Sequence, residues 1–192
     1  MFTGIIEEIA EVVALKKEGK NIHFSLKSNM SSELKVDQSL AHNGVCLTVI
    51  EIQDNIYKVT AVNETLQKTN LCFWQVGSKI NIERSIKLGG RIDGHIVQGH
   101  VDQTAVCTSI EEDKGSYVFT FKYQKSNNIT VSKGSICING VSLTIVSSKE
   151  NSFSVAIIPY TFANTNFHEV KLDSVVNIEF DILGKYIQKI VK

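Results

Sequence analysis

The sequence lacks an excess of charge of either sign. Its 20 lysines and arginines balance its 20 aspartates and glutamates, and no run of basic residues occurs. Proteins that bind nucleic acids commonly carry a basic patch or stripe. The composition therefore argues against a nucleic-acid partner.

Long apolar runs are also missing. No segment approaches the ~20 apolar residues that a membrane-spanning helix requires, so no membrane partner is expected. The first residues, Met1 to Glu8, have no basic region and include two acids, unlike a secretory signal. We expect a soluble protein in the cytoplasm.

Motifs for metals, redox dithiols and nucleotides are absent as well. The cysteines stand far apart without a C-x-x-C motif, which predicts free thiols that pack as small hydrophobes: Cys46, Cys72, Cys107 and Cys137. The glycine-rich segment 88–102 lacks the Lys-Ser/Thr of a P-loop. Within it, His95 and His100 would point to opposite faces of a strand, which disfavours a metal pair. This segment is predicted to turn into the second half of the chain.

What the chain does contain is an internal repeat. Residues 39–83 align with residues 135–179 at a constant offset of 96, and fifteen of the forty-five pairs are identical without a gap. Unrelated segments would match at roughly one position in fifteen or twenty. The repeat predicts two related domains, residues 1–96 and 97–192, and two related binding surfaces for similar or identical molecules.

The hydrophobic pattern is mostly that of strands. Short alternating runs occupy residues 22–26, 45–50, 57–62 and 79–82 in the first half, and 117–121, 141–146, 153–157 and 175–178 in the second. With about six strands in each half, a closed or nearly closed barrel would hide the sheet edges. Short helical turns are expected at 31–34 and 65–71.

The last residues follow a different period. Leu183, Ile187 and Ile190 recur at i, i+4 and i+7, while Lys192 and other polar residues take the opposite face. This predicts a C-terminal amphipathic helix. The periodicity alone fits equally a helix lying on its own barrel and an oligomer seam.

The two halves also differ at equivalent positions. The first strand repeats at an offset of 95, where Gly4, Ala10 and Val12 meet Gly99, Ala105 and Cys107, and this offset places Ile5 opposite His100. At the offset of 96, Cys46 meets Ser142, His42 meets Ile138 and Ser85 meets Asp181. We interpret the shared Asn-Gly-Val-x-Leu-Thr motif as the scaffold of a binding site in each half. The differing residues would give one site a function that the other site lacks.

Six segments carry a family resemblance: residues 1–7, 41–49, 63–66, 94–102, 139–144 and 176–179. They resemble riboflavin synthase, and the match runs from Met1 to the terminal helix. The resemblance implies an all-β fold of two tandem six-stranded antiparallel Greek-key barrels related by internal duplication, plus a C-terminal α-helix. It also implies a homotrimer assembled through these helices, which favours the oligomer seam.

The resemblance implies an enzyme that transfers a four-carbon unit between two molecules of 6,7-dimethyl-8-ribityllumazine. The products are riboflavin and 5-amino-6-(D-ribitylamino)uracil, and no metal or redox cofactor is needed. Its site would hold two lumazines, and the family leaves open an association with lumazine synthase. Two barrels on a short connector cannot readily bring both pockets face to face, so we expect the site to lie between neighbouring chains.

Site residues follow from the resemblance. Ser39, Cys46 and His100 would surround the molecule that is deprotonated or attacked, with His100 as proton carrier and Phe2 as an aromatic lid. Lys133 and Asp181 would contribute from the second barrel. The predicted contacts of one lumazine are Gly4, Ile5, Ile6, Cys46, Leu47, Thr48, Thr60, Ala61, Val62, Asn63, Glu64, Thr65, Gly99, His100 and Val101. Those of the other are Lys133, Ser142, Leu143, Thr144, Ala156, Ile157, Ile158, Pro159, Tyr160 and Thr161, where Tyr160 departs from the acid or histidine usual in the family.

Two other functions share this fold expectation. A non-catalytic lumazine-binding antenna protein would have the same barrels and ligand, but such proteins tend to lose the reactive residues that are present here at Phe2, Ser39, Cys46 and His100. A β-barrel interaction module would not explain why both halves keep the same Asn-Gly-Val-x-Leu-Thr motif.

Overall fold

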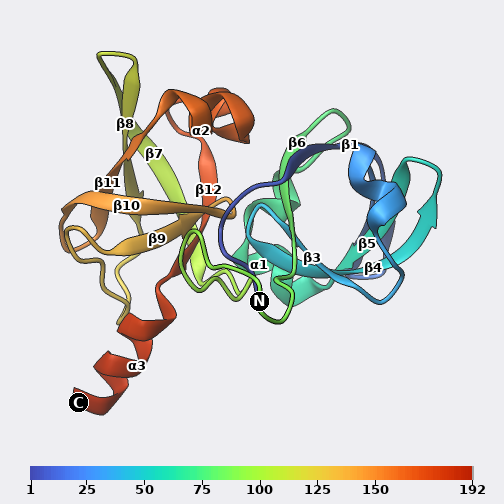
Figure 1. Ribbon diagram of the computed structural model, residues 1–192, viewed down its shortest axis with the longest axis horizontal. Coiled ribbons are helices and arrows are strands. Elements are labelled where there is room, and N and C mark those ends of the chain that lie inside the picture. Colours follow the sequence, from blue (N-terminus) through green and yellow to red (C-terminus); the bar gives the residue numbers. More distant parts are fainter. Residues whose placement is uncertain (192) are drawn as a thin grey trace.

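The computed structural model describes residues 1–191, so Lys192 lies outside the described residues. Two barrels stand side by side, joined by the glycine-rich connector (Figure 1). The first contains β1 (Glu8–Glu18), β2 (Asn21–Lys27), β3 (Ser39–His42), β4 (Val45–Gln53), β5 (Ile56–Ala61) and β6 (Lys79–Arg84). The second contains β7 (Gln103–Asp113), β8 (Ser116–Tyr123), β9 (Ser135–Ile138), β10 (Val141–Ser148), β11 (Ser152–Ile157) and β12 (Val175–Phe180).

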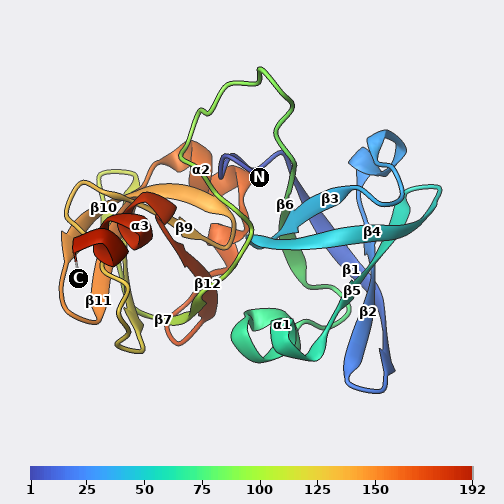
Figure 2. The ribbon, with the colours of Figure 1, turned by 90° about the horizontal axis from the view of Figure 1, so that it is seen from below.

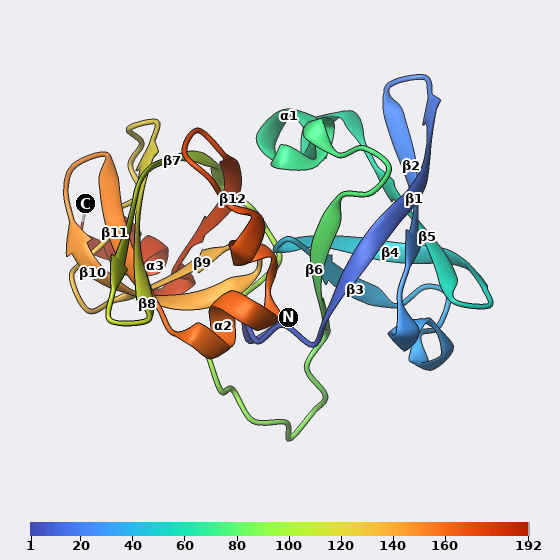
Figure 3. The same ribbon diagram turned by 90° about the horizontal axis from the view of Figure 1, so that it is seen from above.

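Both barrels are closed, antiparallel and alike in topology. The strand order is β1-β2-β5-β4-β3-β6 in the first and β10-β11-β8-β7-β12-β9 in the second. In each, three consecutive strands lie together, β3–β5 or β9–β11, and the next strand along the chain, β6 or β12, returns beside the first of them, which is the Greek-key arrangement. The predicted fold is confirmed, and the two barrels can be followed from below and from above (Figures 2 and 3).

Alternating side chains explain why these segments close into barrels. In β5, Tyr57, Val59 and Ala61 are buried, while Lys58 and Thr60 between them are more exposed. Each barrel thereby encloses its own core. All eight predicted strands are present, although Val62, predicted as a strand end, instead precedes α1 (Asn63–Lys68).

The sequence pattern did not delimit four strands, β1, β3, β7 and β9. The strands β3 and β9 span only four residues each. In β1 and β7 the pairing register shifts between Val12 and Ala14 and between Cys107 and Ser109. Such a bulge inserts a residue and breaks the two-residue period on which a strand is recognised. The strands β4 and β10 also contain a shift, but buried and more exposed residues alternate in each over the five residues before it.

Short helices connect the strands of each barrel. The turn predicted at 31–34 is the 3₁₀ helix η1 (Asn29–Glu33), and the turn predicted at 65–71 divides into α1 and η2 (Asn70–Phe73). The second barrel repeats the latter pair as α2 (Pro159–Asn164) and η3 (Asn166–Glu169). Thr69 and Thr165 cap these 3₁₀ helices by accepting from Leu71 N–H and Phe167 N–H.

Buried asparagines join the two barrels. Asn81 donates from Nδ2 to the Asn139 carbonyl at 2.9 Å, and Asn177 donates to the Asn43 carbonyl at 2.9 Å. Asn166 and Asn70 extend the network, each through its backbone N–H to the facing asparagine, at 2.7 and 2.6 Å. Because these amides are buried and bonded across the interface, they hold the barrels in one orientation.

The C-terminal helix is α3 (Ile182–Val191), as predicted. It extends away from both barrels (Figure 1), and most of its apolar side chains are exposed, from 58% at Leu183 to 81% at Val191. The reading in which this helix lies on its own barrel is therefore not what the structure shows. Among residues 1–191, no helix is long and apolar enough to cross a membrane.

The four cysteines have free thiols, in three different environments. Cys107 and Cys137 are buried, as predicted for small hydrophobes, and burial raises the pKa of both thiols. Cys72, by contrast, is exposed and Cys46 is half-buried on the outside of its barrel. The Cys46 thiol therefore lies on the outer face of β4, where it is partly accessible.

Candidate active site

The candidate site starts on the outer wall of the first barrel, at β3 and β4. In β4, Val45, Leu47 and Val49 are buried in the core, so Cys46 and Thr48 take the outward positions. Register pairs Thr48 with Ser39 and Cys46 with Ala41. Ser39, Cys46 and Thr48, all predicted from the sequence, therefore share one face.

The second barrel repeats this wall with different side chains. Thr144 pairs with Ser135, and Ser142 pairs with Cys137. Ser142 is half-buried and Thr144 is exposed, like their counterparts in the first barrel. The Asn-Gly-Val-x-Leu-Thr motif thus builds the same surface twice, with a thiol on one wall and a hydroxyl on the other.

Two extended segments lie against these walls, and we call residues 2–6 strap 1 and residues 97–101 strap 2. The straps pair with each other at Phe2 and Val97, whose N–H groups donate to each other's carbonyls at 2.7 and 3.1 Å. Cys46 N–H then donates to the Gly99 carbonyl of strap 2 at 2.9 Å. At the equivalent place on the second barrel, Ser142 N–H donates to the Gly4 carbonyl of strap 1 at 2.8 Å.

The straps therefore cross over. Strap 1 leads into the first barrel but lies on the wall of the second, and strap 2 leads into the second barrel but lies on the wall of the first. The structure corrects the sequence-based grouping of Gly4, Ile5 and Ile6 with Cys46, because these residues lie beside Ser142. Gly99, His100 and Val101 do lie with the first barrel, and Val101 packs against its core.

Glycine is needed where each strap meets its wall. Gly4 and Gly99 have φ of 78° and 80°, in the left-handed region. A Cβ on Gly4 would stand 2.6 Å from Ser142 Cβ, and a Cβ on Gly99 would stand 2.6 Å from Cys46 Cβ. These contacts let the strap backbones approach the walls closely.

A cavity of about 490 Å³ opens between strap 1 and the second barrel. This volume lies within the roughly 300–1,000 Å³ typical of small-molecule sites. Of the predicted contacts, Gly4, Ile5, Ile6, Ser142, Tyr160 and Thr161 line it. The sequence interpretation missed other lining residues: Glu7, Glu8, Ile9, Val141, Ala163, Asn164 and Thr165.

His95 belongs to this wall, although the sequence interpretation assigned it no role. Its Nδ1 lies 2.6 Å from Ser142 Oγ. Burial lowers the pKa of His95, and the charge of nearby Asp181 opposes this effect. The imidazole of His95 thus contacts the predicted residue Ser142, and the charge of the predicted residue Asp181 acts on it.

Other predicted residues take places that limit their roles. Leu47, Ala61, Leu143 and Ile157 point into the barrel cores, so only their backbone can reach a ligand. Thr60 faces outward, within 2.8 Å of His23 Nδ1. Thr65 and Thr161 each accept through the backbone carbonyl from the threonine four residues later.

The remaining predictions concern the ends of the wall. The predicted contacts at the end of β11 and around the first residues of α1 and α2 are exposed or half-buried: Val62, Asn63, Glu64, Ala156, Ile158 and Pro159. Lys133 is also exposed, on a turn with φ of 68°. Within residues 1–191, the Lys133 side chain makes no hydrogen bond with Ser142. His100 is exposed at the end of strap 2, next to the Gly99 carbonyl that binds Cys46.

Phe2 is not a lid over the site. Its side chain is 1% exposed and packs with Ala41, Val97 and Cys137, where Cys46 also contacts the cluster. A Cβ on Gly99 would lie 2.8 Å from the Phe2 ring. Phe2 therefore supports strap 2 from beneath.

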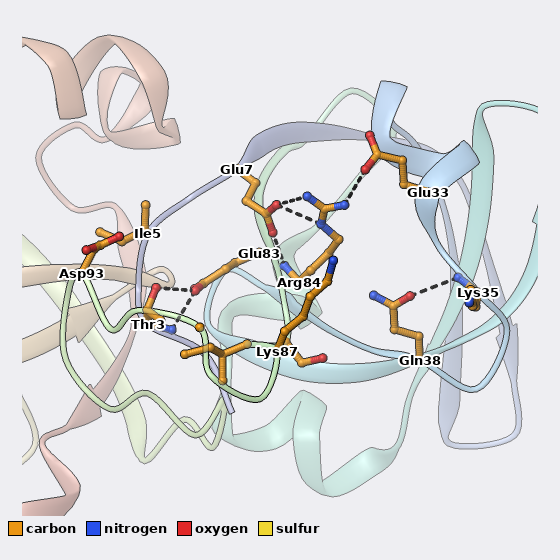
Figure 4. A pocket seen from close by; sticks show the side chains of 13 residues that line it. Thr3, Ile5, Glu7, Glu33, Lys35, Gln38, Glu83, Arg84, Lys87 and Asp93 are labelled. Atoms are coloured by element: carbon orange, nitrogen blue, oxygen red, sulfur yellow. Dashed lines mark hydrogen bonds and ion pairs between the residues drawn. The ribbon is translucent and has the colours of Figure 1, made fainter.

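A second cavity, of about 690 Å³, lies beside strap 1 on the side of the first barrel. Figure 4 shows its charged wall, where Arg84 pairs with both Glu7 and Glu33. These partners neutralise the guanidinium. The same view shows the Thr3 hydroxyl and N–H turned toward Glu83.

Comparison with known proteins agrees with this geometry. The lumazine binding domain model matches residues 3–85 and 98–181, one match for each barrel. Crystallised LumP in complex with riboflavin shares the fold, with a TM-score of 0.86 at 22% identity, over 94% of this chain and 99% of that one.

Sequence relatives are closer. The chain is 41% identical to riboflavin synthase of Bacillus subtilis and 40% identical to that of Bacillus amyloliquefaciens, in each case over 98% of this chain and 89% of the relative. It is 35% identical to riboflavin synthase of Saccharomyces cerevisiae, over 98% of this chain and 85% of the relative. The identity extends along nearly the whole chain, and the Asn-Gly-Val-x-Leu-Thr motif builds the same surface on each barrel. The chain therefore belongs to the riboflavin synthase family.

Proposed function

We propose that this chain is a riboflavin synthase that binds 6,7-dimethyl-8-ribityllumazine on the strap-covered wall of each barrel. A four-carbon unit passes from one lumazine to the other, giving riboflavin and 5-amino-6-(D-ribitylamino)uracil. The observation that carries the proposal is the repeated wall: two copies of one scaffold suit two copies of one substrate.

The side chains that differ between the walls divide the work. The first wall has the Cys46 thiol, the Ser39 hydroxyl and the neighbouring His100, whose imidazole can both accept and donate a proton. The second wall has Ser142 bonded to His95, with Ile5 where the first has His100. We assign proton transfer to the first wall and the holding of the second lumazine to the other.

Most of the rate enhancement comes from bringing the two lumazines together. Fixing two reactants in a reactive orientation contributes up to about 7–11 kcal/mol, and positioned acids and bases contribute about 10²–10⁴-fold. The lumazine C7 methyl is acidic because its carbanion is delocalised into the pteridine ring. The protein therefore needs few reactive groups.

A stoichiometric assay tests the proposal. Purified protein mixed with 6,7-dimethyl-8-ribityllumazine and no added cofactor should form one riboflavin for every two substrates consumed, at the same rate with EDTA. Tight lumazine binding without flavin formation would instead establish a non-catalytic binding protein.

We also propose that the complete site forms between chains of a homotrimer. His100 and Ile5 are exposed on their straps, 47% in the case of Ile5, and the apolar face of α3 has no partner within residues 1–191. Exposed apolar faces of this kind mark interaction surfaces. The N-barrel wall of one chain would then meet the C-barrel wall of its neighbour.

Mixed oligomers test the shared site. One variant carries substitutions at Ser39 and Cys46, the other at Lys133 and Asp181, and the two are co-expressed. A shared site pairs an intact first barrel with an intact second barrel, so activity should partly return. Activity that stays at the single-variant level in verified mixed trimers would place each site within one chain.

A further inference from the structure

The last strand of each barrel ends in a buried carboxylate that binds a strap. Glu83 in β6 and Glu179 in β12 are equivalent at the offset of 96, and they are 5% and 2% exposed. Neither is among the residues that the sequence interpretation assigned to the site. Each lies at the point where the adjoining strap crosses to the other barrel.

Both carboxylates accept hydrogen bonds from strap backbone. Glu83 accepts from Thr3 N–H at 2.7 Å, from the Thr3 hydroxyl at 2.8 Å and from Gly4 N–H at 3.0 Å. Glu179 accepts from Gln98 N–H at 2.6 Å and from His100 N–H at 2.7 Å. Each carboxylate therefore uses both of its oxygens to fix a strap.

Each strap is thus held from two sides. The Gly4 and Gly99 carbonyls bind the wall of one barrel, while neighbouring N–H groups bind the carboxylate of the other barrel. The residue that follows each glycine, Ile5 or His100, is set in position by both contacts. A displacement of about 1 Å at a reacting group can cost about 100-fold in rate.

Stability alone does not explain these carboxylates. Burial raises the pKa of both Glu83 and Glu179, and the strap N–H groups oppose that rise. Removing a charge from water is costly, and a buried charge adds little net stability even when it is well bonded. A carboxylate does offer two acceptors at a fixed spacing, which a glutamine side chain does not.

We propose that Glu179 and Glu83 are positioning residues, Glu179 fixing His100 beside Cys46 and Glu83 fixing Ile5 beside Ser142. This inference rests on the proposed riboflavin synthase activity. The two clamps use equivalent carboxylates but bind different strap positions, since Glu83 accepts from Thr3 and Gly4 whereas Glu179 accepts from Gln98 and His100. Glu179 therefore acts on the proton-transfer wall, and Glu83 acts on the wall that holds the second lumazine.

The matched variants Glu179→Gln and Glu83→Gln test this division. In each, the amide keeps one acceptor and presents its NH₂ group to a strap N–H. We expect Glu179→Gln to lower kcat about tenfold or more with little change in KM, because it displaces an acid–base group. Glu83→Gln should instead raise KM about tenfold, as expected for loss of a charged hydrogen bond next to a binding residue.

A double-variant cycle separates positioning from general damage. If Glu179 acts through His100, Glu179→Gln should change kcat by less than twofold in a His100→Ala background, whereas Glu83→Gln should keep its full effect on KM there. Equal losses of kcat in both backgrounds would overturn the role of Glu179. If wild-type protein forms no riboflavin, the proposed function fails first, so the two failures are distinguishable.

Amide hydrogen exchange in the wild-type protein provides a test that does not depend on a variant folding. The His100 and Gln98 amides should exchange as slowly as those of Thr3 and Gly4, although His100 is exposed. Exchange at His100 as fast as in the exposed connector near Gly89 would contradict the clamp.

Discussion

In the first barrel, His42 and Tyr57 share the core, with their rings 5.6 Å apart. In the second, Ile138 and Phe153 take those positions, and Phe121 and Phe167 pack nearby. The Nδ1–H of His42 donates to the Leu40 carbonyl, and its Nε2 accepts from the Tyr57 hydroxyl, both at 3.0 Å. A polar pair is tolerated there because both partners are hydrogen-bonded.

The connections between the barrels differ much less. Asn43, Asn81, Asn139 and Asn177 are identical in the two halves, as are Glu83 and Glu179. These side chains bind backbone atoms, whose positions are the same in both barrels whatever fills the cores. The comparison teaches that the repeat preserves the groups that fix backbone geometry and allows core and wall residues to diverge.

The largest expected effect breaks the contact between a strap and its wall. Gly99→Ala places a Cβ in the left-handed region and against Cys46, which should cost roughly 2–5 kcal/mol of the unfolding free energy. Gly115→Ala is the control, because its φ is 89° with nothing within 4 Å. Denaturant unfolding and turnover should show a larger loss in Gly99→Ala than in Gly115→Ala. Equal losses would mean that the wall can move.

The next expected effect is a pH dependence of stability that comes from the core of the first barrel. Burial lowers the pKa of His42 from 6.5 to about 4. Between these values the unfolded state binds a proton that the folded state does not, so stability falls as the pH falls, by about 3 kcal/mol in total.

His42→Gln should remove this part of the pH dependence. The comparison isolates His42, because Glu83 and Glu179 titrate in both proteins. Unfolding free energies measured from pH 7 to pH 4 check the prediction, and parallel curves for the two proteins would contradict it.

A smaller effect compares the walls. Cys46→Ser gives the first wall the hydroxyl that the second already has, so the fold should persist. If the thiol takes part in proton transfer, kcat should fall by about tenfold, less than the roughly 10²–10⁴-fold of a whole acid–base group because a serine hydroxyl remains in its place. The reciprocal Ser142→Cys should change lumazine affinity more than kcat. Unchanged turnover in Cys46→Ser would make Cys46 a packing residue.

The smallest effect concerns two equivalent asparagines. The Asn81 side chain makes three hydrogen bonds, to Asn139 and twice to Asn166, whereas that of Asn177 makes two, to Asn43 and Asn70. Asn81→Ala should therefore lower the unfolding free energy by about 1 kcal/mol more than Asn177→Ala. Denaturant unfolding of both variants measures this difference, and equal losses would show that the third hydrogen bond of Asn81 adds no stability.

Much of the fold can be predicted from the sequence, because alternation and the repeat are local or periodic signals. The tail helix follows in the same way from Leu183, Ile187 and Ile190. The bulged strands β1 and β7 were not delimited, since a shift next to Val12 or Cys107 breaks the period. Contacts between residues that lie outside helices and strands produce no periodic pattern in the sequence.

The crossing of the straps was missed for this reason. The sequence interpretation groups the Gly4 segment with Cys46, yet the symmetry of the repeat indicates otherwise: if Gly99 lies beside Cys46, its equivalent Gly4 lies beside Ser142. His95 was judged only as a possible metal ligand on a strand, although its segment is not one. The identical Asn-Ile-Glu at Glu83 and Glu179 was a visible signal for the clamps.

During translation, the contacts of strap 1 form in a fixed order. The strap leaves the ribosome before either of its partners, and Glu83 can bind Thr3 as soon as the first barrel has emerged. Its other partner, Ser142, is translated more than a hundred residues after Gly4. Because domains fold from the N-terminus as they are made, the first barrel folds while strap 1 is bonded to Glu83 but not yet to Ser142. The contact of strap 1 with the second wall forms only after the second barrel has been translated.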